Sequence, residues 1–104
     1  MTPEETALTQ VLAQATGTVA VVLTDAFHPG AQTVAEQAEA LTREIEDLEV
    51  IQLEIGRYRE WAASHDAHGT PAVLVFRGGG RVRRVLGTVS SDRLREALAS
   101  EAGP

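Results

Sequence analysis

A chain of 104 residues, 43% of them apolar, is long enough for one domain with a single core and has no room for a separate substrate domain. Its formal net charge is -6, and all nine basic residues are arginines spread over several segments, so no nucleic-acid-binding surface is expected. There is no cysteine, which excludes disulfides, thiolate metal sites and thiol redox catalysis.

The first predicted element is a helix that Gly17 ends. Thr2 and Glu5 form a T-x-x-E capping box, and Pro3 suits the first helical position. The helix is expected to bury an apolar stripe made of Leu8, Val11, Leu12 and Ala15.

The next two elements are a strand and a long helix. TVAVVL, residues 18–23, shows no polar alternation, which is typical of a parallel strand buried on both faces and indicates the centre of a sheet. After DAFHPG, a helical pattern runs to about Asp47. Its predicted core face consists of Ala31, Val34, Ala35, Ala38, Leu41 and Ile45.

LEVIQLEI then alternates, with Ile51, Leu53 and Ile55 on one side and Gln52 and Glu54 on the other, which predicts a strand at the edge of the sheet. A short helix and a loop follow within residues 57–69, where Tyr58 and Trp61 are expected to pack in the core.

The last part of the chain predicts a hairpin and a helix. TPAVLVF and RVRRVLG, joined by RGGG, read as antiparallel strands, with Arg81, Arg83 and Arg84 protecting the edge. SSDRLREALA reads as a serine-capped helix with Leu94, Ala97 and Leu98 facing inward. The predicted order is α-β-α-β-α-β-β-α.

This order of elements resembles the thioredoxin family, which has a βαβ unit, a connecting helix, a ββα unit and a Gly-x-Pro directly before the third strand. GTPAVLVF, residues 69–76, looks like that Gly-x-Pro and the apolar strand after it. The resemblance implies one domain over residues 1–104, a three-layer α/β sandwich around a mixed four-stranded sheet, with an N-terminal helix in place of the usual first strand. It also implies a cis bond at Pro71, facing the start of the long helix.

The sequence departs from the family in the active-site stretch. The family pattern Trp-Cys-x-x-Cys, laid over FHPGA, places Phe27 at the Trp, His28 at the first Cys and Ala31 at the second. The buried Asp of many thioredoxins falls on Val22. Thiol–disulfide exchange is therefore excluded, no other catalytic constellation is evident, and the chain is not expected to be an enzyme.

The resemblance implies a polypeptide-binding groove without sulfur. In thioredoxin-like proteins the backbone of the residue before the cis-proline, here Thr70, pairs with an extended peptide. The predicted groove consists of Phe27, His28, Pro29, Gly30, Gly69, Thr70 and Pro71. We therefore expect a redox-inactive, cofactor-free module that binds a polypeptide client, as an assembly factor or chaperone does.

The residues leave two other hypotheses open. His28 could centre a small-ligand or metal site, with or without enzymatic activity, if His65, His68 and Asp66 approach it; the other interpretation is a polar loop that happens to contain histidine. Alternatively, an open edge at VIQLEI could pair two copies about a twofold axis.

Location and partners are predicted from what the chain lacks. No stretch approaches the roughly 20 apolar residues that cross a bilayer, and the start MTPEETALTQ is acidic where a signal peptide is basic. We expect a cytoplasmic protein with no membrane and no nucleic-acid partner.

Overall fold

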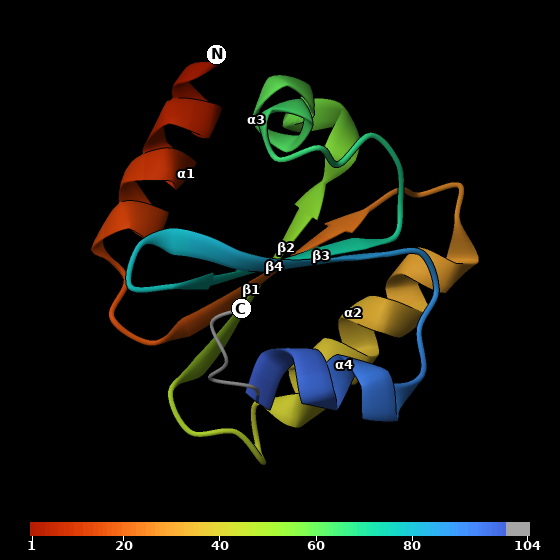
Figure 1. The fold of residues 1–104 in the computed structure, drawn as a ribbon. Helices are drawn as coiled ribbons and strands as arrows, with labels where there is room; N and C mark the ends of the chain where they lie inside the picture. Colours follow the sequence, from red (N-terminus) through yellow and green to blue (C-terminus); the bar gives the residue numbers. More distant parts are fainter. Residues whose placement is uncertain (100–104) are drawn as a thin grey trace.

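The computed structural model describes residues 1–99 (Figure 1). The helices are α1 (Pro3–Gln14), α2 (Pro29–Leu41), α3 (Arg59–Ser64) and α4 (Ser91–Ala99), with one 3-10 turn, η1 (Ile55–Arg57). The strands are β1 (Thr18–Thr24), β2 (Leu48–Glu54), β3 (Ala72–Arg77) and β4 (Gly80–Leu86). This order of helices and strands agrees with the predicted one.

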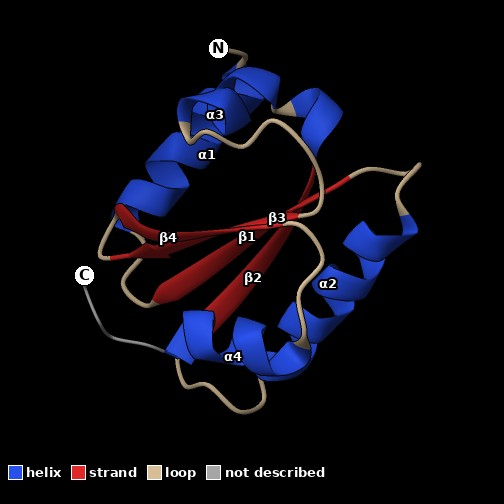
Figure 2. Ribbon diagram, turned by 45° about the vertical axis from the view of Figure 1, so that its right-hand side comes forward, coloured by secondary structure: helices blue, strands red, loops and turns tan. Residues whose placement is uncertain are grey.

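The sheet has the order β2-β1-β3-β4 and is mixed. β1 runs parallel to β2 and antiparallel to β3, and β3 pairs with β4 in a hairpin. Helices α1 and α3 lie on one face of the sheet and α2 and α4 on the other, as Figures 1 and 2 show from two sides. The predicted three-layer sandwich, with a helix at the N-terminus, is confirmed.

The central strand β1 divides the core into two halves. Val19, Val21 and Leu23 face α1 and α3, whereas Ala20 and Val22 face α2 and α4. All five side chains are 2% exposed or less. The continuous apolar run in the sequence is therefore explained by burial on both faces of the sheet.

Helix α1 differs from the prediction in what it buries. Leu8 and Leu12 are buried as expected, but Val11 is 55% exposed. The third buried residue of this helix is Glu5, which is 2% exposed. Glu5 lies one turn before Leu8, and Leu8 lies one turn before Leu12, so the three share the buried face of the helix and Val11 lies outside it.

Two predicted helix ends are wrong. Helix α1 ends at Gln14, three residues before Gly17. Gly17 is needed for a different reason, because a side chain there would overlap the backbone carbonyl oxygen of Asp47. Helix α2 ends at Leu41, well before Asp47. The amides of Thr42, Arg43 and Glu44 each donate to the carbonyl three residues earlier, so the chain tightens into turns after α2.

Both outer strands leave one edge without a neighbouring strand in the part of the chain that is described. β2 ends the sheet on one side and β4 on the other. β2 is not polar on one whole face, because Leu48 and Val50 pack against the α2 side of the core while Ile51 packs against the α1 side. Among residues 1–99, no helix has the length and apolar character needed to span a bilayer.

Candidate functional site

The loop that leads into α2 is held by Asp25. The side-chain Oδ1 of Asp25 accepts the amide of Phe27 at 2.9 Å, and its backbone carbonyl accepts the amide of His28 at 3.0 Å. This turn leaves the Phe27 side chain 94% exposed. Pro29 opens the helix. The loop thus presents an apolar ring to solvent directly before a helix start.

His28 is the N-cap residue of α2, and its side chain makes no capping hydrogen bond. The imidazole folds back over Gly30: a Cβ at Gly30 would lie 3.0 Å from His28 Cε1 and 3.1 Å from Thr88 Oγ1. Glycine at this position therefore lets the imidazole and the Thr88 hydroxyl approach the helix start together.

The positions that matter for thiol chemistry hold small apolar side chains. Ala31, where the family has its second cysteine, and Val22, where many thioredoxins have a buried acid, are both 0% exposed. Val22 lies opposite Val73 across the β1–β3 pair. The site has an apolar floor in place of a group that could take up a proton.

The second predicted segment is the loop before β3. The Thr70–Pro71 peptide bond is cis, and the Pro71 carbonyl accepts the amide of Gly87 at 2.9 Å. Within residues 1–99, neither the amide nor the carbonyl of Thr70 has a hydrogen-bonding partner. Thr70 is half-buried and Gly69 is exposed. The loop therefore offers free backbone groups beside a strand that begins two residues later.

This loop lines a shallow hollow of about 300 Å³, which we call the proline-loop hollow. Its lining residues are Asp66, His68, Gly69, Thr70, Pro71, Leu86 and Gly87. Leu86 lines the same hollow and is 52% exposed. The hollow combines a free backbone segment with an accessible aliphatic side chain.

The two predicted halves of the groove lie at the same end of the sheet, as Figure 1 shows. They are connected by Gly87 and Thr88: Gly87 bonds to Pro71, and Thr88 lies against Gly30. Phe27, His28 and Pro29 do not line the proline-loop hollow. Leu86, Gly87 and Thr88 are not among the predicted groove residues, although the pairing of the two hairpin strands brings Leu86 opposite Ala72.

His65 does not join His28 in a cluster. Its ring lies 4.9 Å from that of Trp61 and 5.3 Å from that of Phe76, so it belongs to an aromatic group under the sheet edge. Burial lowers the pKa of His65, the Arg81 guanidinium lowers it further, and Asp66 acts in the opposite direction.

Within residues 1–99, no three or more His, Cys, Asp or Glu side chains come together in a way that could hold a metal ion. His68 is exposed and lines the proline-loop hollow, whereas His28 caps α2. The three histidines considered as ligands thus lie in three different surroundings.

A larger hollow of about 580 Å³ lies at the other end of the sheet. It is lined by residues 14–19 and 47–49, where α1 meets β1 and where β2 begins. None of the predicted groove residues lies there, so volume alone does not indicate the site.

Comparison of the sequence finds no matching family model and no significant match to a curated protein. The structure, in contrast, is similar to a mutant thioredoxin from Halobacterium salinarum NRC-1, with a TM-score of 0.77 and 21% identity over 93% of this chain and 87% of that one. The chain has the thioredoxin fold.

Two further structures share this fold. One is the thioredoxin of Fasciola hepatica, with a TM-score of 0.75, 23% identity, and 88% of each chain covered. The other comes from work on the thiol resolving mechanism in yeast mitochondrial 1-Cys peroxiredoxin via glutathione/thioredoxin systems; its TM-score is 0.78 at 10% identity, covering 89% of this chain and 86% of that one. Because this thioredoxin fold contains no cysteine, it cannot carry out thiol–disulfide exchange.

Proposed function

We propose that the chain is a redox-inactive module that binds an extended polypeptide along the Gly69–Pro71 loop. The observation that carries this proposal is the free backbone of Thr70, whose amide and carbonyl have no partner within residues 1–99. A half-buried backbone segment beside a sheet is suited to pair with an added strand, because main-chain hydrogen bonds require no particular side-chain chemistry.

Apolar side chains near the loop support the proposal. Leu86 lines the same hollow as Thr70, and Phe27 is almost fully exposed in the loop before α2. Exposed aromatic and aliphatic side chains beside free backbone groups are typical of peptide-binding surfaces. The bound segment would pair with Thr70 through its backbone and contact Leu86 and Phe27 through its side chains.

Amide hydrogen exchange gives a direct test. Peptides selected from a random display library against the full chain would be added to the labelled protein, and exchange followed by NMR. We expect the exchange of the Thr70 amide to slow on binding, since a bound strand accepts its hydrogen bond. The amide of Thr16, in the loop before β1 at the opposite end of the sheet, serves as the internal control.

A pair of truncations tests the apolar contact. Phe27→Ala is expected to weaken peptide binding by about tenfold, the effect of losing one well-packed interface side chain. Val11→Ala, which shortens an exposed apolar side chain on α1, is the matched control and is expected to leave affinity unchanged. Failure to select any peptide, or an unchanged Thr70 amide in the complex, would refute the proposed function.

A further inference from the structure

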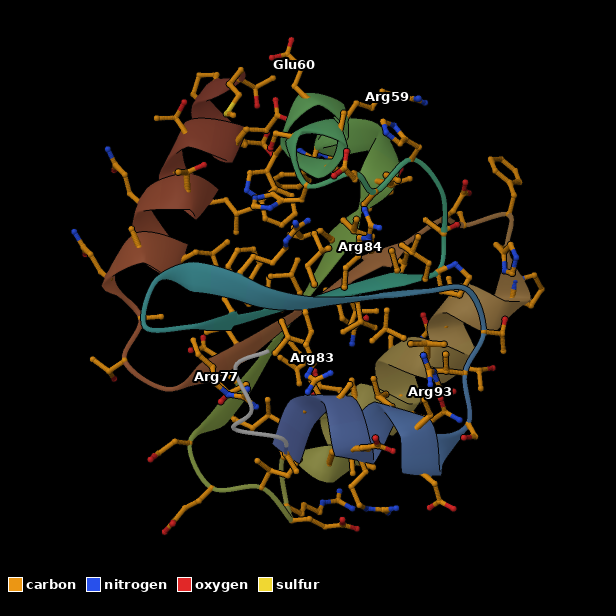
Figure 3. All side chains as sticks on the ribbon, viewed as in Figure 1. Arg59, Glu60, Arg77, Arg83, Arg84 and Arg93 are labelled. Carbon is orange, nitrogen blue, oxygen red and sulfur yellow. The ribbon has the colours of Figure 1, made fainter. Side chains whose placement is uncertain are left out.

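The arginines of this acidic protein are concentrated in one part of the chain. Six of the nine lie between Arg77 and Arg95, a segment with one acidic residue, Asp92. The protein has fifteen acidic residues, and the other fourteen lie outside this segment. Figure 3 shows labelled arginines of this segment along β4 and α4. β4 and α4 together carry five arginines and two acidic residues, Asp92 and Glu96, so they are basic although the protein carries a net charge of -6.

Three of these arginines line a hollow of about 300 Å³ between β4 and α4, which we call the arginine hollow. Its lining residues are Arg83, Arg84, Val85, Arg93, Glu96 and Ala97. Arg83 and Arg93 lie on the α4 side of β4, and the Arg84 side chain extends on the other side (Figure 3). Guanidinium groups thus stand on both faces of the same edge strand.

Three other arginines of the segment are engaged elsewhere. Arg81 donates to the carbonyl of His65 at 2.6 Å. Arg95 binds Glu44 and Asp92, each at 2.8 Å. Arg77 donates to Thr18 Oγ1 at 3.0 Å and to the carbonyl of Leu98 at 2.7 Å. Arg84 Nη1 donates to the Asp66 backbone carbonyl at 3.2 Å, whereas its contact with the Asp66 carboxylate is long, at 3.6 Å, and the Asp66 side chain is 72% exposed. An exposed pair of this kind contributes little, so another carboxylate can take the place of Asp66.

The backbone of β4 is oriented to accept a further strand. The bond from the Gly87 amide to Pro71 makes these two residues a hydrogen-bonded pair of the antiparallel ladder. Such pairs alternate, so Val85 and Arg83 point their backbone groups toward β3, and the N–H and C=O groups of Arg84 and Leu86 point to the open edge.

This edge is continuous with the proline-loop hollow. Leu86 and Asp66 line that hollow, Asp66 contacts Arg84, and Arg84 lines the arginine hollow. A polypeptide that extends from Thr70 along the edge of β4 would reach the arginines within a few residues.

We propose that the surface formed by Arg83, Arg84 and Arg93 binds an acidic segment of the polypeptide partner. An added strand places successive side chains on opposite faces, where they meet Arg84 on one face and Arg83 and Arg93 on the other. Guanidinium groups bind carboxylates through paired, charge-assisted hydrogen bonds. The inference rests on the proposed function in one respect, namely that the acidic segment belongs to the polypeptide that pairs with Thr70.

A polypeptide fits this surface better than a nucleic acid. Glu96 lines the arginine hollow, and most of the remaining surface charge is acidic. A nucleic acid carries a negative charge at every residue and would meet repulsion beyond the arginines, whereas a peptide can confine its carboxylates to the segment that contacts them. The open strand edge also offers backbone hydrogen bonds that an extended peptide can use.

The test compares selections from one random library of peptides of about ten residues, the upper length of a common strand. The targets are the wild-type chain, the double variant Arg84→Gln with Arg93→Gln, and a control, Arg43→Gln with Arg57→Gln. The control removes the same charge and also one exposed ion pair, Arg57 with Glu4 at 3.3 Å. Peptides selected by the wild type and by the control should be enriched in Asp and Glu, and those selected by the double variant should not.

Affinities then measure the effect. The best acidic peptide is expected to bind the double variant about tenfold more weakly than the wild type, and the control as tightly as the wild type. Its binding to the wild type should be weaker at about 1 M salt than at about 0.15 M salt. No acidic enrichment, or equal losses in the double variant and the control, would overturn the inference. So would displacement of the peptide by a single-stranded oligonucleotide at equal or lower concentration.

The same peptides separate this inference from the proposed function. Slowed exchange at Thr70 with no acidic preference would leave the proposed function standing and refute the arginine site. An acidic preference that depends on Arg84 and Arg93, without any change at the Thr70 amide, would support the arginine site and refute the proposed function.

Discussion

At the level of single residues, Glu5 links two helices through one carboxylate. Its Oε1 accepts the Thr2 amide at 3.0 Å, which completes the capping box of α1. Its Oε2 accepts the Trp61 amide at 2.6 Å, in the first turn of α3. A buried carboxylate with a backbone donor on each oxygen is stabilised in its charged form.

Glu5 should give the protein a specific acid sensitivity. The backbone amides of Thr2 and Trp61 lower the pKa of Glu5 from its ordinary value of 4.5. A lowered carboxyl pKa stabilises the folded state above the unfolded pKa, and this stabilisation is lost as the pH falls through the folded pKa. We expect Glu5→Gln to lower Tm at pH 7, and the difference from wild type to shrink as the pH drops below 4.5.

Thermal unfolding followed by circular dichroism between about pH 7 and about pH 3 would measure this difference, since that range spans the loss of the carboxylate charge. Glu36→Gln, an exposed substitution on α2, is the control and should leave Tm unchanged. A Tm difference for Glu5→Gln that stays constant over the whole pH range would contradict the assignment.

Gly17 is required by a close approach between two segments. An added Cβ would overlap the Asp47 carbonyl oxygen, and the Gly17 neighbour Thr18 already donates its amide to that carbonyl at 3.1 Å. Gly17→Ala should therefore destabilise the fold by about 1–3 kcal/mol, the usual cost of overpacking. Gly69→Ala, where nothing lies within 4 Å, should change the unfolding free energy by less than about 0.5 kcal/mol in urea titrations. Equal effects of the two substitutions would contradict this account.

Sequence patterns predicted such residues only in part. The Thr2–Glu5 spacing revealed the capping box, because both partners lie in one helix turn. The bond from the Trp61 amide to Glu5 spans 56 positions and has no local signature. Gly17 was likewise interpreted as a helix end, since its contact with Asp47 depends on how two distant segments meet.

At the level of elements, the edge strand β2 has two kinds of backbone group. The bond from the Thr18 amide to the Asp47 carbonyl sets the parallel ladder, so odd-numbered residues of β2 point their backbone groups toward β1. The groups of Leu48, Val50, Gln52 and Glu54 therefore face the open edge.

A proline comparison tests this orientation. Ile51→Pro removes a ladder hydrogen bond to β1 and should cost about 3 kcal/mol or more. Gln52→Pro removes an amide that faces the open edge, so it should cost much less. Urea unfolding of the two variants measures both costs, and a loss for Gln52→Pro as large as that for Ile51→Pro would show that the orientation is wrong.

Elements were predictable where their signals are local. The apolar run of β1 and the alternation of the second strand identified the centre and one edge of the sheet. The end of α2 was missed because Ile45 continues the helical spacing although the chain has already turned after Leu41. Periodicity alone does not distinguish a helix from a series of turns that buries the same side chain.

At the level of the whole molecule, the open edge of β2 predicts that two copies of the chain can associate through this strand. A twofold antiparallel pairing with Val50 opposite Gln52 would use the outward backbone groups and set Glu49 opposite Leu53, so no two carboxylates would face each other directly. The copies still carry like net charge, and salt screens that repulsion. We expect a weak dimer whose affinity rises with ionic strength. The Gln52→Pro variant should be monomeric.

Light scattering at increasing protein and salt concentrations measures this equilibrium. A wild-type chain that stays monomeric at high micromolar concentration in every salt would refute the pairing. Association that weakens with salt would point instead to contact between the acidic and the basic sides of the protein.

The whole-molecule prediction succeeded for the fold, whereas the groove stays a prediction. Order of elements, layers and strand arrangement follow from patterns spread over the chain, so errors at single helix ends did not change them. The predicted groove depends on which loops meet, and Gly87 and Thr88 contact its predicted residues Pro71 and Gly30 only in the folded chain. No residue-type signal in the sequence marks them.

The bare aromatic side chain before α2 also offers an experimental handle. Since the chain is free of sulfhydryl groups, Phe27→Cys would create a unique attachment point for a maleimide dye. The Phe27 side chain that it replaces is 94% exposed. The fluorophore would report ligand arrival at that rim in real time with no background labelling to subtract, at an affinity lowered by the loss of the Phe27 ring.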